Sequence, residues 1–205
     1  MKIVISSDHA GYKLKEEIKP FLKTKTETTE DLGPFSESPV DFPDYALRVA
    51  ELVSRGEADF GIMIDGVGSS SAIVCNKLPG IRASVVYNEF SSKIAKEHSN
   101  ANILCLGSKS LGADDAIKIL DTFFSAEFLG GKYKNRLQKV EDIENKYLIK
   151  PDKSSLLKKK LVTETDLRES KRAGTPILLS KSMSKFTPSA LEFIEKNSDI
   201  ITWEP

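Results

Sequence analysis

A carboxylate and an imidazole stand side by side in the segment Ser7-Asp8-His9-Ala10-Gly11, directly after an apolar run. Such a pair can orient substrate hydroxyls and bind a phosphate group. The two residues alone do not establish a site, because an aspartate at this position would serve equally well as the cap of a following helix.

A second polar segment combines one carboxylate with two glycines and three serines. It follows the apolar run Phe60–Ile64 and reads Asp65-Gly66-Val67-Gly68-Ser69-Ser70-Ser71. Glycines let the backbone approach a ligand, and the amides at the start of a following helix favour negative charge. This geometry could stabilise a developing enediolate. The segment is not a Walker motif, since no Gly-Lys-Ser/Thr closes it, and it is too short for a dinucleotide fingerprint.

His9 and His98 are the only two histidines, and each lies in a polar run at the edge of a predicted strand. One histidine in such a place would more often be structural. Two of them, in loops that we expect the fold to bring to the same region, indicate a site. Lys132 and Arg136 are four residues apart and share a face if a helix resumes there. They could hold a phosphate or simply begin a solvated basic helix.

The elements that must position these residues alternate regularly along the first part of the chain. The apolar patterns predict strands over residues 2–6, 26–32, 60–64, 82–87 and 102–107, and helices over 12–22, 44–54, 69–75, 90–98 and 113–124. Five strands, each followed by a helix, predict a doubly wound α/β fold with a parallel sheet. Ligands in such folds bind beyond the carboxyl ends of the strands. We therefore expect the chemistry just after residues 6, 64, 87 and 107.

Composition excludes several classes of function. The chain of 205 residues has 30 Lys and Arg and 30 Asp and Glu, so it has no global field that would attract nucleic acid or an anionic membrane. Its two cysteines, Cys75 and Cys105, lie in apolar segments and lack metal-ligand spacing. The N-terminal segment, with its short apolar run, is not expected to act as a signal peptide, and the sequence has no apolar run of about 20 residues. We expect a cytoplasmic protein without a metal site and without redox chemistry from paired thiols.

The composition changes after residue 147. Residues 149–160, with Pro, Ser and five Lys, are typical of a linker. Beyond them, Thr163 is predicted to cap a helix, 176–179 to form a short strand, and Thr187-Pro188 to open a helix through Glu195. We expect a main domain over 1–147 and an extension over 148–205, too small for a large core and therefore packed on the main domain or on a partner.

Taken together, these segments resemble the ribose-5-phosphate isomerase B family, which includes the galactose-6-phosphate isomerase subunits. The matching segments keep the family's order over residues 1–147: SDHAG, DLG, SPVDFPDYA, GEADFGIMIDGVGSS, NKLPGIRA, KEHSNANILCLGSKSLG and AEFLGGKYKNRL. The resemblance implies a Rossmann-like, three-layer α/β/α subunit in a homodimer, or a dimer of dimers, with sites at the dimer interface. It also implies a cofactor-free and metal-independent aldose–ketose isomerase. The first substrate pair to expect is ribose 5-phosphate and ribulose 5-phosphate, interconverted through a cis-enediolate.

The resemblance also assigns roles to single residues. It places His98 at sugar-ring opening, Asp8 and His9 at the substrate hydroxyls and phosphate, and Asp65 at a position of the catalytic base. The remaining substrate contacts that it implies are an enediolate cradle from Gly66, Val67, Gly68, Ser69 and Ser70, a contact from Ser99, and a phosphate clamp from Lys109, Lys132 and Arg136, partly supplied by the partner subunit.

Six positions depart from the family's pattern. Asp65 stands where many relatives have Cys, and Ser71 stands where others have a carboxylate, which makes Ser71 the alternative base. Val67 replaces Thr, Ser99 replaces Asn, and Lys109 and Lys132 replace arginines that bind phosphate bidentately. These changes keep two alternatives open: an isomerase of a tetrose or hexose phosphate, and a non-catalytic scaffold that binds a sugar phosphate.

A second resemblance concerns the extension. The segments LVTETDL and FTPSAL are similar to a short module of enzymes associated with bacterial microcompartments. This similarity implies that the extension docks the enzyme to a partner or a shell.

Overall fold

The computed structural model describes residues 1–26, 28–148, 161–172, 177–180, 185–198 and 201–204. The chain divides into two compact units, Met1–Glu141 and Asp142–Pro205. The predicted linker, residues 149–160, lies outside the described residues. None of the described helices combines the length and the apolar character needed to cross a membrane.

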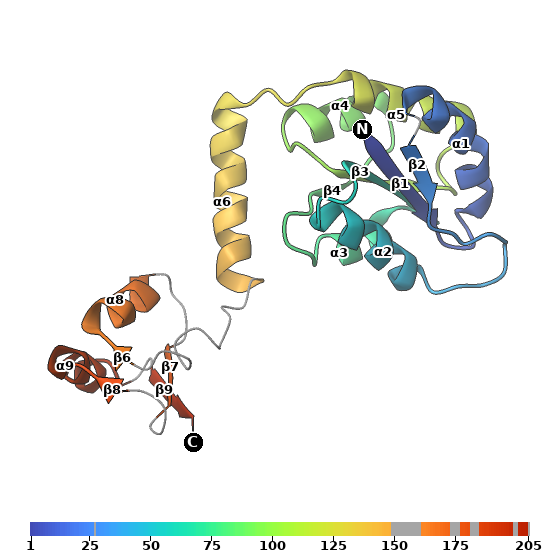
Figure 1. The fold of residues 1–205 in the computed structure, drawn as a ribbon. Helices are drawn as coiled ribbons and strands as arrows, with labels where there is room; N and C mark the ends of the chain where they lie inside the picture. Colours follow the sequence, from blue (N-terminus) through green and yellow to red (C-terminus); the bar gives the residue numbers. More distant parts are fainter. Residues whose placement is uncertain (27, 149–160, 173–176, 181–184, 199–200, 205) are drawn as a thin grey trace. The chain divides into compact units, whose positions relative to one another are not determined.

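The first unit is built on a five-stranded parallel sheet with the strand order β2-β1-β3-β5-β4 (Figure 1). Its strands are β1 (Lys2–Ser7), β2 (Thr28–Asp31), β3 (Phe60–Asp65), β4 (Ala83–Val85) and β5 (Ile103–Gly107). Its helices are α1 (Tyr12–Lys25), α2 (Phe42–Ser54), α3 (Ser69–Cys75), α4 (Glu89–Glu97), α5 (Ala113–Ser125) and α6 (Gly131–Tyr147), of which α6 continues into the second unit. The order places β1, β3 and β5 side by side in the centre of the sheet.

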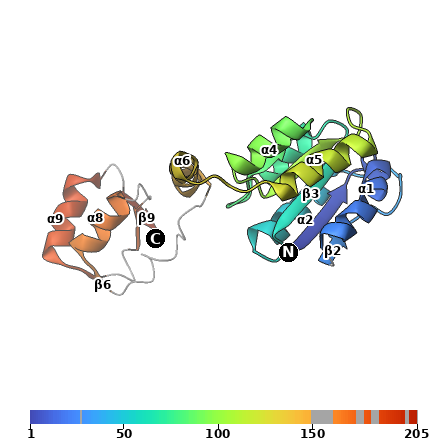
Figure 2. The same ribbon diagram turned by 90° about the horizontal axis from the view of Figure 1, so that it is seen from above.

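Helices cover both faces of this sheet, as Figures 1 and 2 show. One core packs residues of β1, β3 and β5 against α1, α4 and α5, and it includes Ile5, Ile18 and Phe123. The other packs the opposite face of the strands against α2 and α3, and it includes Val4, Val49 and Cys105. Alternation of side chains along each strand supplies both cores, because successive residues point to opposite faces. The predicted doubly wound, three-layer fold is confirmed.

The observed ends of several elements differ from the predicted ones by one to three residues, and the differences at α2 and β4 have a clear cause. Helix α2 begins at Phe42, two residues before the predicted start, because Pro43 is well suited to a first helical turn. Strand β4 is limited to Ala83–Val85, although the apolar pattern extends from residue 82 to 87. As an edge strand it pairs only with β5, so its length depends on where that neighbour offers partners.

Beyond α6, the described residues of the second unit form two helices and two pairs of short parallel strands. Its elements are β6 (Leu161–Val162), α8 (Glu164–Arg172), β7 (Ile177–Ser180), β8 (Lys185–Phe186), α9 (Pro188–Lys196) and β9 (Ile201–Glu204). β6 pairs with β8, and β7 pairs with β9. The predicted cap of α9 is present, since the Oγ1 atom of Thr187 accepts a hydrogen bond from the amide of Ala190. Six buried side chains form a small separate core: Val162, Leu167, Ile177, Leu179, Ala190 and Phe193.

Candidate active site

Three strand ends meet at the carboxyl edge of the sheet and bring the first set of predicted site residues together. The amide of Asp8, after β1, donates to the carbonyl of Ile64 in β3 at 2.9 Å. The amide of Lys109, after β5, donates to the carbonyl of Gly66 at 3.0 Å. A Cβ on Gly11 would lie 2.3 Å from the Ile64 carbonyl oxygen, so the chain can approach this closely only at a glycine.

Asp65 lies at the centre of this edge and is only 3% exposed. Its Oδ1 atom accepts hydrogen bonds from the amides of Val67, at 2.8 Å, and Gly68. Its Oδ2 atom accepts from the amide of Ser71 at 2.9 Å and from the Ser71 hydroxyl at 2.6 Å. The carboxylate therefore closes its own loop and caps the start of α3, where the amides have no intrahelical acceptor.

The two residues predicted as alternative bases thus contact each other directly. Ser71 is fully buried and donates its hydroxyl proton toward Asp65. A serine hydroxyl held in this way faces the carboxylate and not the open side of the loop. In the same arrangement, two amides of the predicted enediolate cradle, those of Val67 and Gly68, point at Asp65.

Asp8 and His9 flank the loop from the end of β1. The Oδ1 atom of Asp8 accepts the amide of Gly11 at 2.8 Å, so this aspartate does hold the turn into α1, as its alternative interpretation predicts. The Nδ1 atom of His9 lies 3.3 Å from the carbonyl oxygen of Val40 and 3.4 Å from its amide nitrogen. The segment that precedes α2 therefore contacts the exposed His9 ring and orients it.

His98 lies elsewhere in the first unit. It caps the carboxyl end of α4 and precedes β5, and β5 runs parallel to β3. The residues before Ile103 are consequently at the amino edge of the sheet, whereas His9 follows β1 at the carboxyl edge. Our expectation that the fold brings both histidines to the same region is wrong for a single chain, because a helix that crosses back to a parallel strand ends at the opposite edge.

A second cluster forms around His98. Its ring stacks on that of Tyr133, with centroids 4.0 Å apart and an angle of 13° between the planes. Lys132 and Arg136 lie over the same tyrosine ring, at 5.1 and 5.6 Å from its centroid. Three of the predicted residues are thus assembled on α4 and α6 by one aromatic side chain, with Ser99 next to His98 in sequence.

Sequence reasoning missed Tyr133. The available signal was its position inside the basic segment Lys132-Tyr133-Lys134-Asn135-Arg136, where it is the only aromatic residue. An aromatic ring between two cations at helical spacing can hold both by cation–π contact.

The two cysteines, which are 30 residues apart in the sequence, come together in the core behind the loop. A hydrogen bond with Cys75, burial, and electrostatic repulsion from Cys75 and Asp65 raise the pKa of Cys105 well above its usual value. Both cysteines are free and buried, so neither presents a thiolate at the carboxyl edge. No group of three or more His, Cys, Asp or Glu in the described ranges is arranged to hold a metal ion.

Comparison with known proteins identifies the family. Residues 3–140 match the model of the Ribose/Galactose Isomerase family. Ribose-5-phosphate isomerase B of Escherichia coli (strain K12) is 36% identical over 145 residues, which cover 71% of this chain and 97% of that protein.

Solved structures agree with this match. The structure of ribose-5-phosphate isomerase B from Clostridium thermocellum is 48% identical with a TM-score of 0.70, and the alignment covers 72% of this chain and 99% of that one. The structure from Mycoplasma genitalium with bound ribulose-5-phosphate is 39% identical with a TM-score of 0.67, over 70% of this chain and 95% of that one. The chain therefore belongs to the ribose/galactose isomerase family.

Proposed function

We propose that the protein is an aldose–ketose isomerase that interconverts ribose 5-phosphate and ribulose 5-phosphate through a cis-enediolate. The observation that carries this proposal is the chemistry of the two clusters. One holds a buried carboxylate among backbone amides, and the other holds an imidazole stacked beside two cations. The relatives named ribose-5-phosphate isomerase B, one of them with bound ribulose-5-phosphate, support this choice of substrate.

In the proposed reaction Asp65 takes the proton from C2 of the aldose and returns it to C1 of the ketose. A second proton moves from the C2 hydroxyl to the oxygen on C1, so the two sugars differ only in where these protons reside. The amides of residues 66–70 would stabilise the negative charge on the enediolate oxygens. Because Asp65 now accepts two of these amides itself, we infer that the loop opens and exchanges those hydrogen bonds when substrate enters.

The other residues act on the rest of the substrate in this proposal. His98 assists opening of the sugar ring, Asp8 and Ser99 bind hydroxyls, and His9 binds a hydroxyl or the phosphate. Lys109, Lys132 and Arg136 supply positive charge to the phosphate. Lysine retains the charge but offers no planar fork, so the phosphate is expected to be held less rigidly than by arginine.

We also propose that the protein acts as a homodimer with each site shared between two chains, either alone or as a dimer of dimers. His98 and Asp65 are at opposite edges of one sheet, so a site with both requires a second copy. Exposed apolar side chains lie in and near the loop after β3. They include Val67 in that loop, Ile73 in α3 and Tyr87 just after the edge strand β4. Helix α6 also exposes Val140 and Ile143, and burial of such a face is a usual driving force for association.

The second unit is proposed to dock the enzyme to another protein, which in a bacterial cell could be a component of a microcompartment. Its separate core and its two helices, capped by Thr163 before α8 and Thr187 before α9, support a module that presents a surface of its own. The proposed location is cytoplasmic.

Solvent isotope exchange tests the reaction. The protein is incubated in heavy water with ribose 5-phosphate, ribulose 5-phosphate and a panel of tetrose and hexose phosphates, and deuterium at C1 and C2 is followed by NMR. We expect exchange and turnover with the pentose phosphates. Exchange only with a tetrose or hexose phosphate would move the assignment to that sugar. Binding without exchange of any member would contradict isomerase activity and favour a scaffold.

A further inference from the structure

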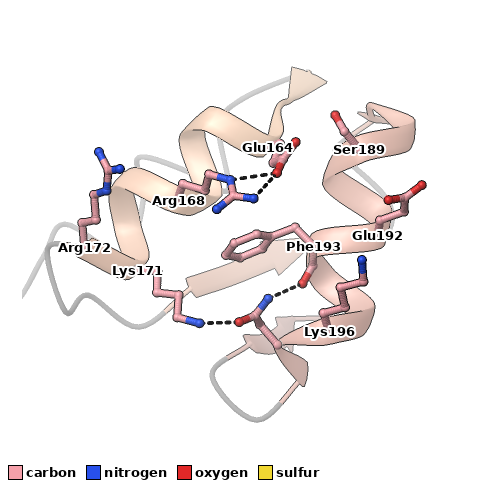
Figure 3. Close-up of a pocket in the computed structure, with 9 residues that line it drawn as sticks. Glu164, Arg168, Lys171, Arg172, Ser189, Glu192, Phe193 and Lys196 are labelled. Carbon is pink, nitrogen blue, oxygen red and sulfur yellow. Dashed lines mark hydrogen bonds and ion pairs between the residues drawn. The ribbon is translucent and has the colours of Figure 1, made fainter.

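A groove of about 480 Å³ lies between α8 and α9 of the second unit (Figure 3). Each helix contributes one face, since the lining positions 164, 168, 171 and 172 of α8 and 189, 192, 193 and 196 of α9 follow helical spacing. The side chain of Phe193 forms the floor and is almost completely buried.

Charge is segregated into this groove. Residues 161–205 contain six Lys and Arg and seven Asp and Glu. Four of the six cations line the groove, with only two of the seven acids. Outside the groove, residues 161–205 have only two Lys against five Asp and Glu, so the groove is a local region of positive charge that the net charge of this segment conceals.

The charged side chains that line the groove differ in the contacts they form. The guanidinium of Arg168 forms two contacts with Glu164, at 2.7 and 2.6 Å, and Lys171 donates to the side chain of Asn197. Both cations also lie over the Phe193 ring, with centroid distances of 5.5 and 5.8 Å. These contacts hold one part of the groove in a defined shape, which reduces the ordering cost of binding.

The second pair of lining cations has no acidic partner among the described residues. Arg172 and Lys196 form no ion pair with any residue in the described part of the chain, and neither does Glu192. The two cations come from different helices, so they can contact separate acidic groups of one extended ligand.

We propose that this groove binds an acidic peptide segment of a partner protein, with carboxylates contacting Arg172 and Lys196. The proposal deepens the docking function above and rests on it. A single phosphate would need cations that converge on one point, whereas these are spread over two helices. Single-stranded nucleic acid would use exposed aromatic rings for stacking, and the ring in the groove is buried.

Fluorescence anisotropy of a labelled acidic peptide with the full chain tests this proposal. The probe is a helical peptide of about 12 residues with glutamates at i, i+3 and i+4 spacing. We expect binding at low salt that weakens as salt is added. The double variant Arg172→Gln/Lys196→Gln should bind about tenfold more weakly, because it removes two exposed charge pairs. Glu192→Gln should bind about threefold more tightly, since it removes an acid from the groove.

Matched controls separate the groove from net charge. Lys139→Gln/Lys185→Gln removes two exposed cations outside the groove, and Glu195→Gln removes an acid from the same helix as Glu192 but outside the lining. Both should change affinity less than about twofold. Equal effects of groove and control variants would overturn the proposal, as would absence of peptide binding at low salt. Tighter binding of a single-stranded RNA through Arg172 and Lys196 would also overturn it.

Isomerase turnover of each variant is measured in parallel and should equal that of the unmodified chain. A protein that binds the peptide but lacks turnover would contradict the isomerase proposal alone. A protein with turnover but without peptide binding would contradict only the docking proposal and the groove.

Discussion

At the scale of single residues, Asp65 is the decisive side chain. Its carboxylate accepts four hydrogen bonds from Val67, Gly68 and Ser71, so it stabilises the loop and the start of α3. The proposed base is thus also a helix cap, and proton transfer requires some of these bonds to open. Substitutions at this position must therefore be judged on both stability and turnover.

Asp65→Asn is expected to lower turnover by at least about 100-fold, because an amide cannot accept the substrate proton. Binding of the substrate phosphate, measured by calorimetry with ribose 5-phosphate, should change little. Ser71→Ala is the matched control, since it removes the 2.6 Å hydrogen bond to the same carboxylate and leaves the carboxylate in place. If Ser71→Ala abolishes turnover while Asp65→Asn retains it, Ser71 is the base.

At the scale of elements, the site depends on close contacts between strand ends and on the ion pairs that position them. Gly11 lets the start of α1 meet the end of β3. Behind it, the fully buried Lys15 of α1 binds Asp31 of β2 at 2.7 Å and the carbonyl of Pro34 at 2.7 Å. These contacts connect α1 to the turn after β2, whose Gly33 carbonyl accepts the hydroxyl of Ser6.

Gly11→Ala should destabilise the fold by about 1–3 kcal/mol, because the added Cβ would meet backbone atoms that cannot move aside cheaply. Urea denaturation of the full chain measures this loss. Gly112→Ala is the control, since a Cβ there has open space and the backbone φ of −83° suits any residue. If both variants lose similar free energy of unfolding, the close backbone contact at Gly11 is not the cause of the loss.

The ion pairs of Asp31 with Lys15 and Lys19 predict how the stability of the fold depends on acid. Burial opposes ionisation of Asp31, but hydrogen bonds from Lys15 and Lys19 outweigh it and lower the pKa of this carboxyl. A lowered folded-state pKa stabilises the fold above the unfolded value of about 3.9, and this contribution is lost as the pH falls through the folded value. The free energy of unfolding should therefore decrease below about pH 4.

Asp31→Asn should be destabilised at pH 7, since it leaves the buried Lys15 with a single carboxylate contact, the longer 3.6 Å one to Glu16, and its stability should depend less on pH in the acid range. Glu37→Gln is the matched control, because the pair of Glu37 with Lys13 is exposed and should contribute less than about 1 kcal/mol. Unfolding curves at pH 7 and at about pH 3, below the unfolded value, measure both. If the free energy of unfolding of Asp31→Asn falls at acid pH as much as that of the unmodified chain, the Asp31 carboxylate is not the source of the acid sensitivity.

At the scale of the whole molecule, the two clusters of the proposed site belong to opposite edges of one sheet. Asp65 and Lys109 lie at the carboxyl edge, and His98, Lys132 and Arg136 surround Tyr133 near the amino edge. A second copy related by a twofold axis would supply each site with the cluster it lacks.

Mixing two inactive variants tests this arrangement. Asp65→Asn and His98→Asn chains are unfolded together, refolded and assayed for isomerase turnover. In a shared-site dimer, half of the refolded dimers are mixed and each contains one intact site, so about a quarter of normal activity should return. The separately refolded parents are the control. Activity no higher than that of the parents would show that each site is built by one chain.

The sequence alone predicts the main fold well because its signals are local. The alternation of β-branched runs with amphipathic stretches predicts all five strands and the helices that follow them, and Gly68 and Pro43 mark helix starts at short range. The pairs β6–β8 and β7–β9 are harder to predict, since strands of two and four residues depend on partners far along the chain.

For the site, sequence determines the residue types at each strand end and therefore the class of chemistry. Only the tertiary structure decides which of them meet. It directs the Asp65 carboxylate into its own loop, joins it to Ser71, places Tyr133 under His98, and separates the two histidines. These outcomes depend on strand order and on parallel pairing, which set the edge of the sheet where each loop emerges and which residue spacing does not encode.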